Sequence, residues 1–170
     1  DLREVNLTRA VLARADLLGA DLSGSNLASA NLSAADLNDA CLVGVDADNA
    51  HFVGATMVGA DLTDATLYDA DFRRAHLTGA TLRSAGMANA DLTSAVLPNA
   101  DLTGADLTNA GLRRADLARA TLIGAVLGGA DLGTADLRGA DCRAADWRGA
   151  ELVGADLRHA DLRGVNWEGV

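Results

Sequence analysis

The sequence predicts an all-β solenoid whose coils have four sides and twenty residues each, and three observations lead to this fold class. First, an apolar residue recurs at every fifth position from Leu2 to Trp167 without a slip of register. Second, the residue two places after each of these centres is often glycine, asparagine or aspartate, which tolerate a positive φ angle. Third, the unusual large centres come in pairs twenty residues apart, Phe52 with Phe72 and Trp147 with Trp167.

The five-residue period excludes the two common regular structures. The 34 centres comprise 26 leucines, two phenylalanines, two methionines, two tryptophans, Ala47 and Cys142. An α-helix turns about 100° per residue, so a five-residue step would scatter these side chains around the helix. A straight strand alternates its faces, so an odd spacing would send successive centres to opposite sides. A chain that turns a corner after each short extended piece can point every centre into one shared interior.

A second inward position and a volume match complete the predicted core. Alanine stands two residues before nearly every centre, the exceptions being Val5, Ser25, Val45 and Val165. The small centre Ala47 is followed by the large centre Phe52, and Cys142 is followed by Trp147. We therefore expect small and large side chains to fill one layer together, with the structural core including Phe52, Phe72, Trp147 and Trp167.

The repeat unit resembles that of the pentapeptide-repeat proteins, whose consensus is A(D/N)LXX. The stretches "ADLTG", "ADLRG", "ANLSA" and "ADFRR" match it as they stand, and the resemblance covers all 34 units. It implies a right-handed quadrilateral parallel β-helix forming a single domain over residues 1–170, with the centre and the preceding alanine inside and the other three positions facing solvent. With about 4.8 Å between stacked strands, about 8.5 coils would give a rod roughly 40 Å long.

Composition limits the classes of partner and the compartment. The net charge is −10, from 24 acids and 14 basic residues that are all arginine, which argues against direct nucleic-acid binding. No apolar run approaches the eighteen or so residues of a membrane helix, so no membrane contact is expected. Cys41 and Cys142 have no CxxC spacing, which favours neither a disulfide framework nor a zinc site. We expect a cytoplasmic protein.

Catalysis, metals and cofactors find no support in the sequence. The three histidines, His51, His76 and His159, share no motif, although His51 is expected one coil below Asp71. A rod filled by leucine and alanine leaves no cleft, and neither a phosphate-binding GxxxxGK[ST] loop nor a GxSxG elbow occurs. We expect Cys142 to be an interior filler, Cys41 to face solvent, and Trp167 to cover the last coil.

The acids are unevenly distributed along the chain. No basic residue occurs between Arg14 and Arg73, and this stretch supplies a candidate acidic face for a basic partner: Asp36, Asp39, Asp46, Asp48, Asp61, Asp64, Asp69 and Asp71. The alternative interpretation is that these acids only keep a rod with exposed edges soluble. Towards the other end, arginines accumulate, but each follows an aspartate by two residues, which predicts a mixed surface.

Both terminal coils are expected to expose strand edges and apolar side chains. Repeat proteins normally carry polar caps at their ends. Either end-to-end association into a homodimer or truncation of a longer chain would account for their absence here.

Two functions of different class remain open at this point. The first is a non-enzymatic interaction scaffold, a stiff acidic rod for an unidentified protein partner. The second follows from the resemblance, because some pentapeptide-repeat proteins imitate duplex DNA, bind DNA gyrase and other type II topoisomerases, and protect against quinolones or toxins. The sequence shares their rod and negative charge but has neither an interrupting loop nor the C-terminal helix that makes their dimer.

Overall fold

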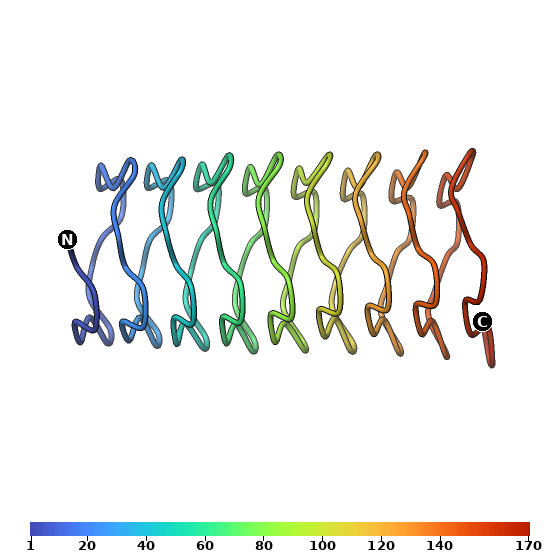
Figure 1. Ribbon diagram of the computed structural model, residues 1–170, viewed down its shortest axis with the longest axis horizontal. Coiled ribbons are helices and arrows are strands. Elements are labelled where there is room, and N and C mark those ends of the chain that lie inside the picture. The colour runs from blue at the N-terminus through green and yellow to red at the C-terminus, as the bar shows by residue number, and fades with distance from the viewer.

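The chain winds into an elongated stack of coils, with its two termini at opposite ends (Figure 1). The computed structural model describes all 170 residues, Asp1–Val170. It contains no α-helix and no extended strand; its regular elements are isolated parallel β-bridges separated by two-residue turns. The structure accordingly holds no helix that could span a membrane.

The bridges join residues twenty apart and form four columns along the stack. The series begins with Asn6 and Asn26 and ends with Asp146 and Asn166, always at the residue before a centre. Each coil therefore has four sides. The predicted vertical pairs are confirmed, since the rings of Phe52 and Phe72 stack with centroids 4.7 Å apart and 7° between planes. The rings of Trp147 and Trp167 meet edge to face, with centroids 5.1 Å apart.

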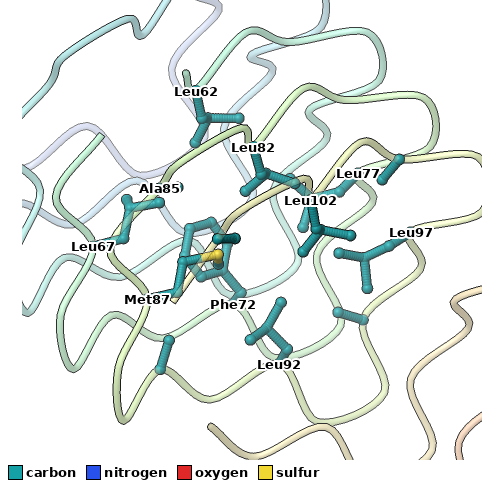
Figure 2. Close-up of a cluster of buried hydrophobic side chains, with 14 of the residues drawn as sticks. Leu62, Leu67, Phe72, Leu77, Leu82, Ala85, Met87, Leu92, Leu97 and Leu102 are labelled. Carbon is teal, nitrogen blue, oxygen red and sulfur yellow. The ribbon is translucent and has the colours of Figure 1, made fainter. Parts of the chain in front are cut away.

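The interior is one continuous apolar core of 51 buried residues. Every centre from Leu22 to Trp147 is fully buried, and so is the residue two places before each centre from Leu27 to Trp147, which is alanine except at Ser25 and Val45. Figure 2 shows leucines from successive coils, Leu62, Leu82 and Leu102, reaching into this interior. The one buried polar residue is Ser25, which replaces an inward alanine. The centres of the terminal coils are only partly covered. The prediction that Trp167 belongs to the core is therefore wrong: its side chain is 40% exposed and covers the last coil incompletely.

Backbone hydrogen bonds explain why every five-residue unit repeats the same conformation. The amides of the centre, of the residue before it and of the second residue after it donate to carbonyl groups of neighbouring coils. The amide of the next inward residue donates back to the centre and closes the turn, as Ala65 does to the Leu62 carbonyl oxygen at 3.2 Å. One amide per unit, that of the first turn residue, has no backbone partner.

Aspartate or asparagine, which precedes 21 of the 34 centres, supplies the missing acceptor in those units. The Oδ1 atom of Asp61, for example, accepts the amide hydrogen of Thr63 at 2.9 Å. Every aspartate or asparagine at this position makes the same bond, the Asx turn that these side chains favour. This bond to the turn amide explains the consensus preference for D or N.

Three units with another residue before the centre satisfy or remove this amide differently. The amide of Val58 donates to Asn38 Oδ1 in the preceding coil at 2.8 Å, and that of Tyr68 donates to Asp48 Oδ1 at 3.0 Å. The only proline, Pro98, occupies a first turn position and has no amide hydrogen. Val96, which precedes that centre, could not have accepted one.

Replacing Asp116 by alanine tests the role of the turn acceptor. Asp116 Oδ1 accepts the amide hydrogen of Ala118 at 3.0 Å, and its carboxylate forms no ion pair. We expect Asp116→Ala to lower the free energy of unfolding by about 1 kcal/mol, the usual net value of one hydrogen bond. Asp116→Asn keeps the acceptor and should be nearly neutral in urea denaturation. Equal losses for both variants would show that the charge, not the bond, matters.

The second turn residue adopts a positive φ angle in every unit, as the turn composition predicts. Glycine accepts this conformation without steric cost, but arginine, serine, alanine and even a threonine, Thr134 at φ 57°, also adopt it. The stacked backbone hydrogen bonds impose this conformation on residues that do not favour it. These side chains thereby point outward from the corners of the coils.

Two neighbouring corners on one side allow this strain to be measured. A Cβ atom added at Gly124, where φ is 65°, would meet nothing within 4 Å, so only the backbone conformation opposes it. We expect Gly124→Ala to destabilise by about 1 kcal/mol, and Ala144→Gly, one coil further at φ 56°, to stabilise by a similar amount. Thermal denaturation of both variants measures the difference. Shifts of the same sign would contradict the strain argument.

Candidate interaction surfaces

The eight acids predicted as a partner face surround the rod. Because residues twenty apart share a column, the register distributes them over all four sides. Asp36 and Asp39 lie on one side, Asp61 and Asp64 on another, Asp71 on a third, and the remaining three on the fourth: Asp46, Asp48 and Asp69. We call these eight residues the acidic belt. The structure thus places them in neighbouring coils but not on one flat surface.

The acids of the belt differ in how far their charge is compensated. Asp71 is the only acid of the belt that forms an ion pair. Asp71 lies 2.6 Å from Arg73 Nη2, and this hydrogen-bonded guanidinium lowers the pKa of its carboxyl group, an effect that burial opposes. The predicted position of His51 one coil below Asp71 is confirmed, with Nδ1 4.0 Å from Oδ2.

The surroundings of Asp48, a member of the acidic belt, disfavour the charged form of its carboxyl group. Partial burial raises the pKa of its carboxyl group, and the nearby carboxylates of Asp46 and Asp69 raise it further, against the opposing effect of the bond from the Tyr68 amide. A basic group from outside would relieve this repulsion. Nowhere in the chain do three or more histidine, cysteine or acidic side chains form a group that could hold a metal ion.

The arginines near the C-terminal end are paired with acids, as the two-residue spacing predicts. Arg158 donates to Asp156 from Nη2 at 2.6 Å and from Nε at 2.9 Å, and Arg163 binds Asp161 in the same way. Both members of each pair leave the coil on the same side because they flank one inward centre. The same arrangement recurs at Arg3, Arg73, Arg138, Arg143 and Arg148. This end is therefore mixed, not basic.

Because of these pairs, we expect the stability of the fold to fall at acidic pH. The hydrogen-bonded guanidinium groups of Arg158 and Arg163 lower the pKa values of Asp156 and Asp161 to about 2, compared with about 3.9 in an unfolded chain. Because the folded-state pKa is the lower one, the pairs stabilise the fold above about pH 4, and this contribution disappears as the pH falls towards 2. We expect the thermal midpoint, followed by circular dichroism, to fall across this window.

The matched control for this pH dependence is the double variant Arg158→Gln, Arg163→Gln. It removes the partners that depress the two pKa values, so its midpoint should fall less steeply between about pH 4 and 2. Parallel curves for variant and parent would contradict the assignment of the effect to these pairs.

Neither cysteine has the surroundings of a reactive thiol. Cys142 is fully buried among apolar side chains, and burial raises the pKa of its thiol to about 12. The predicted interior position is confirmed. Cys41, expected to face solvent, is half-buried, and its Sγ atom lies 3.1 Å from Ser23 Oγ of the preceding coil. The ladder of outward side chains covers part of it, which the sequence did not indicate.

The surface has three open hollows, and the largest is lined by arginines. It measures about 410 Å³ and is bordered by Val53, Arg73, Arg74, Thr93, Ser94 and Arg114. Another, of about 370 Å³, lies beside Pro98, Arg119 and His159. Sequence reasoning treated the arginines only along the chain and missed the first hollow. Sorting charges by the twenty-residue register would have found it.

A family model for pentapeptide repeats matches eight times, at residues 1–39, 30–69, 40–79, 60–99, 75–114, 85–122, 100–139 and 135–169. The chain belongs to the pentapeptide-repeat family. The resemblance predicted from the A(D/N)LXX units is thereby confirmed. No curated protein matches the sequence.

Solved structures of other family members resemble this one. HetL, a pentapeptide-repeat protein involved in regulating heterocyst differentiation in the cyanobacterium Nostoc sp. strain PCC 7120, is 30% identical, with a TM-score of 0.52. The match covers 97% of this chain and 90% of HetL. A trypsin-treated variant of QnrB1, a plasmid-mediated fluoroquinolone resistance protein, is 24% identical, with a TM-score of 0.51 and coverage of 93% and 86%. The second likeness concerns the fold alone.

Proposed function

We propose that this pentapeptide-repeat protein is a non-enzymatic scaffold, a rigid acidic rod that binds a protein partner through its outer side chains. The observation that carries this proposal is the use of the interior for packing, with every centre from Leu22 to Trp147 fully buried and only open hollows outside. Substrate sites are usually enclosed clefts that bury most of the ligand. Binding by the outer ladders needs no such cleft.

The rod offers a partner side chains at fixed spacings. Each coil is hydrogen-bonded to the coils on both sides, and each corner is held at a defined positive φ angle. Pre-ordered side chains lose little conformational entropy on binding. We further propose that the coils form a right-handed quadrilateral β-helix of about 8.5 turns, which is a single domain over residues 1–170. We also propose a cytoplasmic location and the end-to-end pairing of two rods through a terminal coil.

The acidic belt is the surface that we propose for a basic partner. Seven of its acids carry no internal counter-charge, and the pKa of Asp48 is raised by burial and further by the neighbouring carboxylates of Asp46 and Asp69. A lysine- or arginine-rich segment wrapping the rod would neutralise this repulsion and gain charge-assisted bonds. Such binding should weaken steeply with salt, since both surfaces are exposed.

A charge-neutralised variant tests this surface without disturbing the turns. Asp39, Asp64 and Asp69 occupy second turn positions and do not accept the turn amide, so Asp39→Asn, Asp64→Asn and Asp69→Asn together remove charge but preserve the fold. The matched control neutralises three unpaired acids outside the acidic belt, Asp106→Asn, Asp116→Asn and Glu151→Gln. Partners captured from the source lysate by the immobilised rod should be lost from the first variant and retained by the control. Equal capture by both would refute the acidic belt as the contact surface.

DNA mimicry directed at DNA gyrase is the second candidate, and the distribution of the acids favours it. The unpaired acids of the acidic belt lie on three consecutive sides of the rod, so negative charge extends part of the way around it, as phosphates extend around a duplex, and the fold is shared with QnrB1. A gyrase supercoiling assay separates the candidates. Inhibition or drug protection that disappears with the belt variant supports mimicry, and no effect at micromolar rod leaves the general scaffold.

A further inference from the structure

The arginines fall into two structural groups with different availability. Those at first turn positions are all bonded to an aspartate of the same or the next coil. Those at second turn positions form no ion pair: Arg9, Arg14, Arg74, Arg114 and Arg119. Only the second group has a free guanidinium to offer a ligand.

Two of the free arginines converge on the same hollow. Arg74 and Arg114 occupy one corner column two coils apart, with Ser94 between them. Two coil spacings separate their Cα atoms by about 9.6 Å, a gap that two arginine side chains can close from opposite directions. Backbone bonds hold all three positions, including Ser94 N to the Arg113 carbonyl oxygen at 2.9 Å. The hollow of about 410 Å³ lies over this column.

The lining of the hollow adds two hydroxyl groups without internal partners. At other first turn positions the threonine hydroxyl donates to the preceding aspartate, as Thr103 does to Asp101 at 2.5 Å and Thr108 does to Asp106 at 2.6 Å. Thr93 makes no such bond to Asp91, whose carboxylate instead lies 3.6 Å from Arg73 Nε. Ser94 Oγ likewise forms no bond within the chain. Both hydroxyls border the hollow.

The side that contains this hollow differs in charge from the rest of the rod. It carries five arginines, Arg14, Arg73, Arg74, Arg113 and Arg114, against four acids, Asp71, Asp91, Asp131 and Glu151. In a chain of net charge −10, it is the one side on which positive charge exceeds negative charge. Three of these acids, Asp71, Asp91 and Asp131, lie within 4 Å of an arginine nitrogen, which limits their repulsion of an anion.

We propose that Arg74 and Arg114, with the hydroxyls of Thr93 and Ser94, bind a single phosphoryl group on a partner protein. A phosphoryl dianion has three oxygens and can accept from two guanidinium forks and two hydroxyls, whereas a carboxylate has two oxygens in one plane and a single negative charge. The acidic neighbouring sides repel a continuous chain of phosphates, which disfavours nucleic acid and favours one isolated phosphate. This inference rests on the proposed scaffold role and names the chemistry of one contact.

The probe is a labelled glycine- and serine-rich peptide with one phosphoserine, compared with its unphosphorylated and glutamate forms. We expect fluorescence anisotropy to show binding of the phosphopeptide only, and NMR to show shifts of the Arg74 and Arg114 Nε–Hε signals in the unmodified rod. Arg74→Gln and Arg114→Gln should each weaken binding about ten-fold or more. Arg119→Gln, which removes a free arginine from the other hollow, should leave binding unchanged.

Several results would overturn the inference. These are equal affinity for the three peptides, unchanged Nε–Hε signals, inorganic phosphate binding as tightly as the phosphopeptide, or binding at these arginines only by an oligonucleotide or by phosphoinositide vesicles. A captured partner that neither phosphatase treatment nor Arg74→Gln releases would also overturn it, while leaving the scaffold intact. Phosphopeptide binding by a rod that captures no partner would count against the scaffold alone.

Discussion

Replacing Ala47 by leucine is expected to lower the free energy of unfolding by about 1–3 kcal/mol, although leucine is the consensus centre. Ala47 and Phe52 are successive centres of one coil, and both are fully buried. Because the two centres are neighbours in one coil, we infer that the phenylalanine fills the space beside the alanine, so a leucine at position 47 would overfill the layer. Urea denaturation followed by circular dichroism measures the loss. An unchanged midpoint would contradict this account of the packing.

The companion change Phe52→Leu shows whether the two positions act together. Alone it should cost about 1 kcal/mol or more for the void it leaves, in addition to the stacking of Phe52 on Phe72 at 4.7 Å. In the double variant Ala47→Leu, Phe52→Leu, the added leucine fills that void. We expect the loss of unfolding free energy in the double variant to be smaller than the sum of the two single losses by at least about 0.5 kcal/mol. Strict additivity would show that the two side chains do not share one layer.

Trp147→Ala is expected to cost about 3–5 kcal/mol, the largest effect of any single change considered for this chain. The Trp147 side chain is fully buried beside the small centre Cys142, and it packs edge to face with Trp167. Trp167→Ala is the matched control, because the same kind of ring is 40% exposed there and loses less on removal. The order of the two losses in urea denaturation checks the argument. A larger loss for Trp167→Ala would contradict it.

Trp147→Phe separates the volume of the ring from its polar atom. The indole Nε1 of Trp147 is buried without a hydrogen-bond partner, an arrangement that costs about 1–3 kcal/mol. Phenylalanine keeps most of the packing and removes this penalty, so the net loss should be far smaller than for alanine. If Trp147→Phe proved as damaging as Trp147→Ala, the unpartnered nitrogen would not be a significant cost.

Most of the fold could be predicted because the five-residue period leaves few alternatives. The stacking of Phe52 on Phe72, the interior place of Cys142 and the positive φ of the corner residues all followed from spacing and residue type. The role of the aspartate before each centre did not. A sequence shows that Asp61 is preferred there, but only the turn geometry shows an amide hydrogen of Thr63 with no other acceptor.

The candidate surfaces were less predictable, because they depend on which side of the rod each residue occupies. Asp36 and Asp71 appeared to share one face when counted along the chain, yet the register places them on different sides. Arg74 and Arg114 are forty residues apart in sequence, and no local motif links them. Their pairing depends on stacking, which brings every twentieth residue into one column.

The sequence by itself determined that this chain is a pentapeptide-repeat solenoid with a leucine and alanine interior, because inward positions must recur with the geometry of the coil. Only the tertiary structure decided which charges are free. An ion pair or a hydrogen bond depends on side-chain direction and on distances of a few ångströms between coils, as in the contrast between Arg73, held by Asp71, and its unpaired neighbour Arg74.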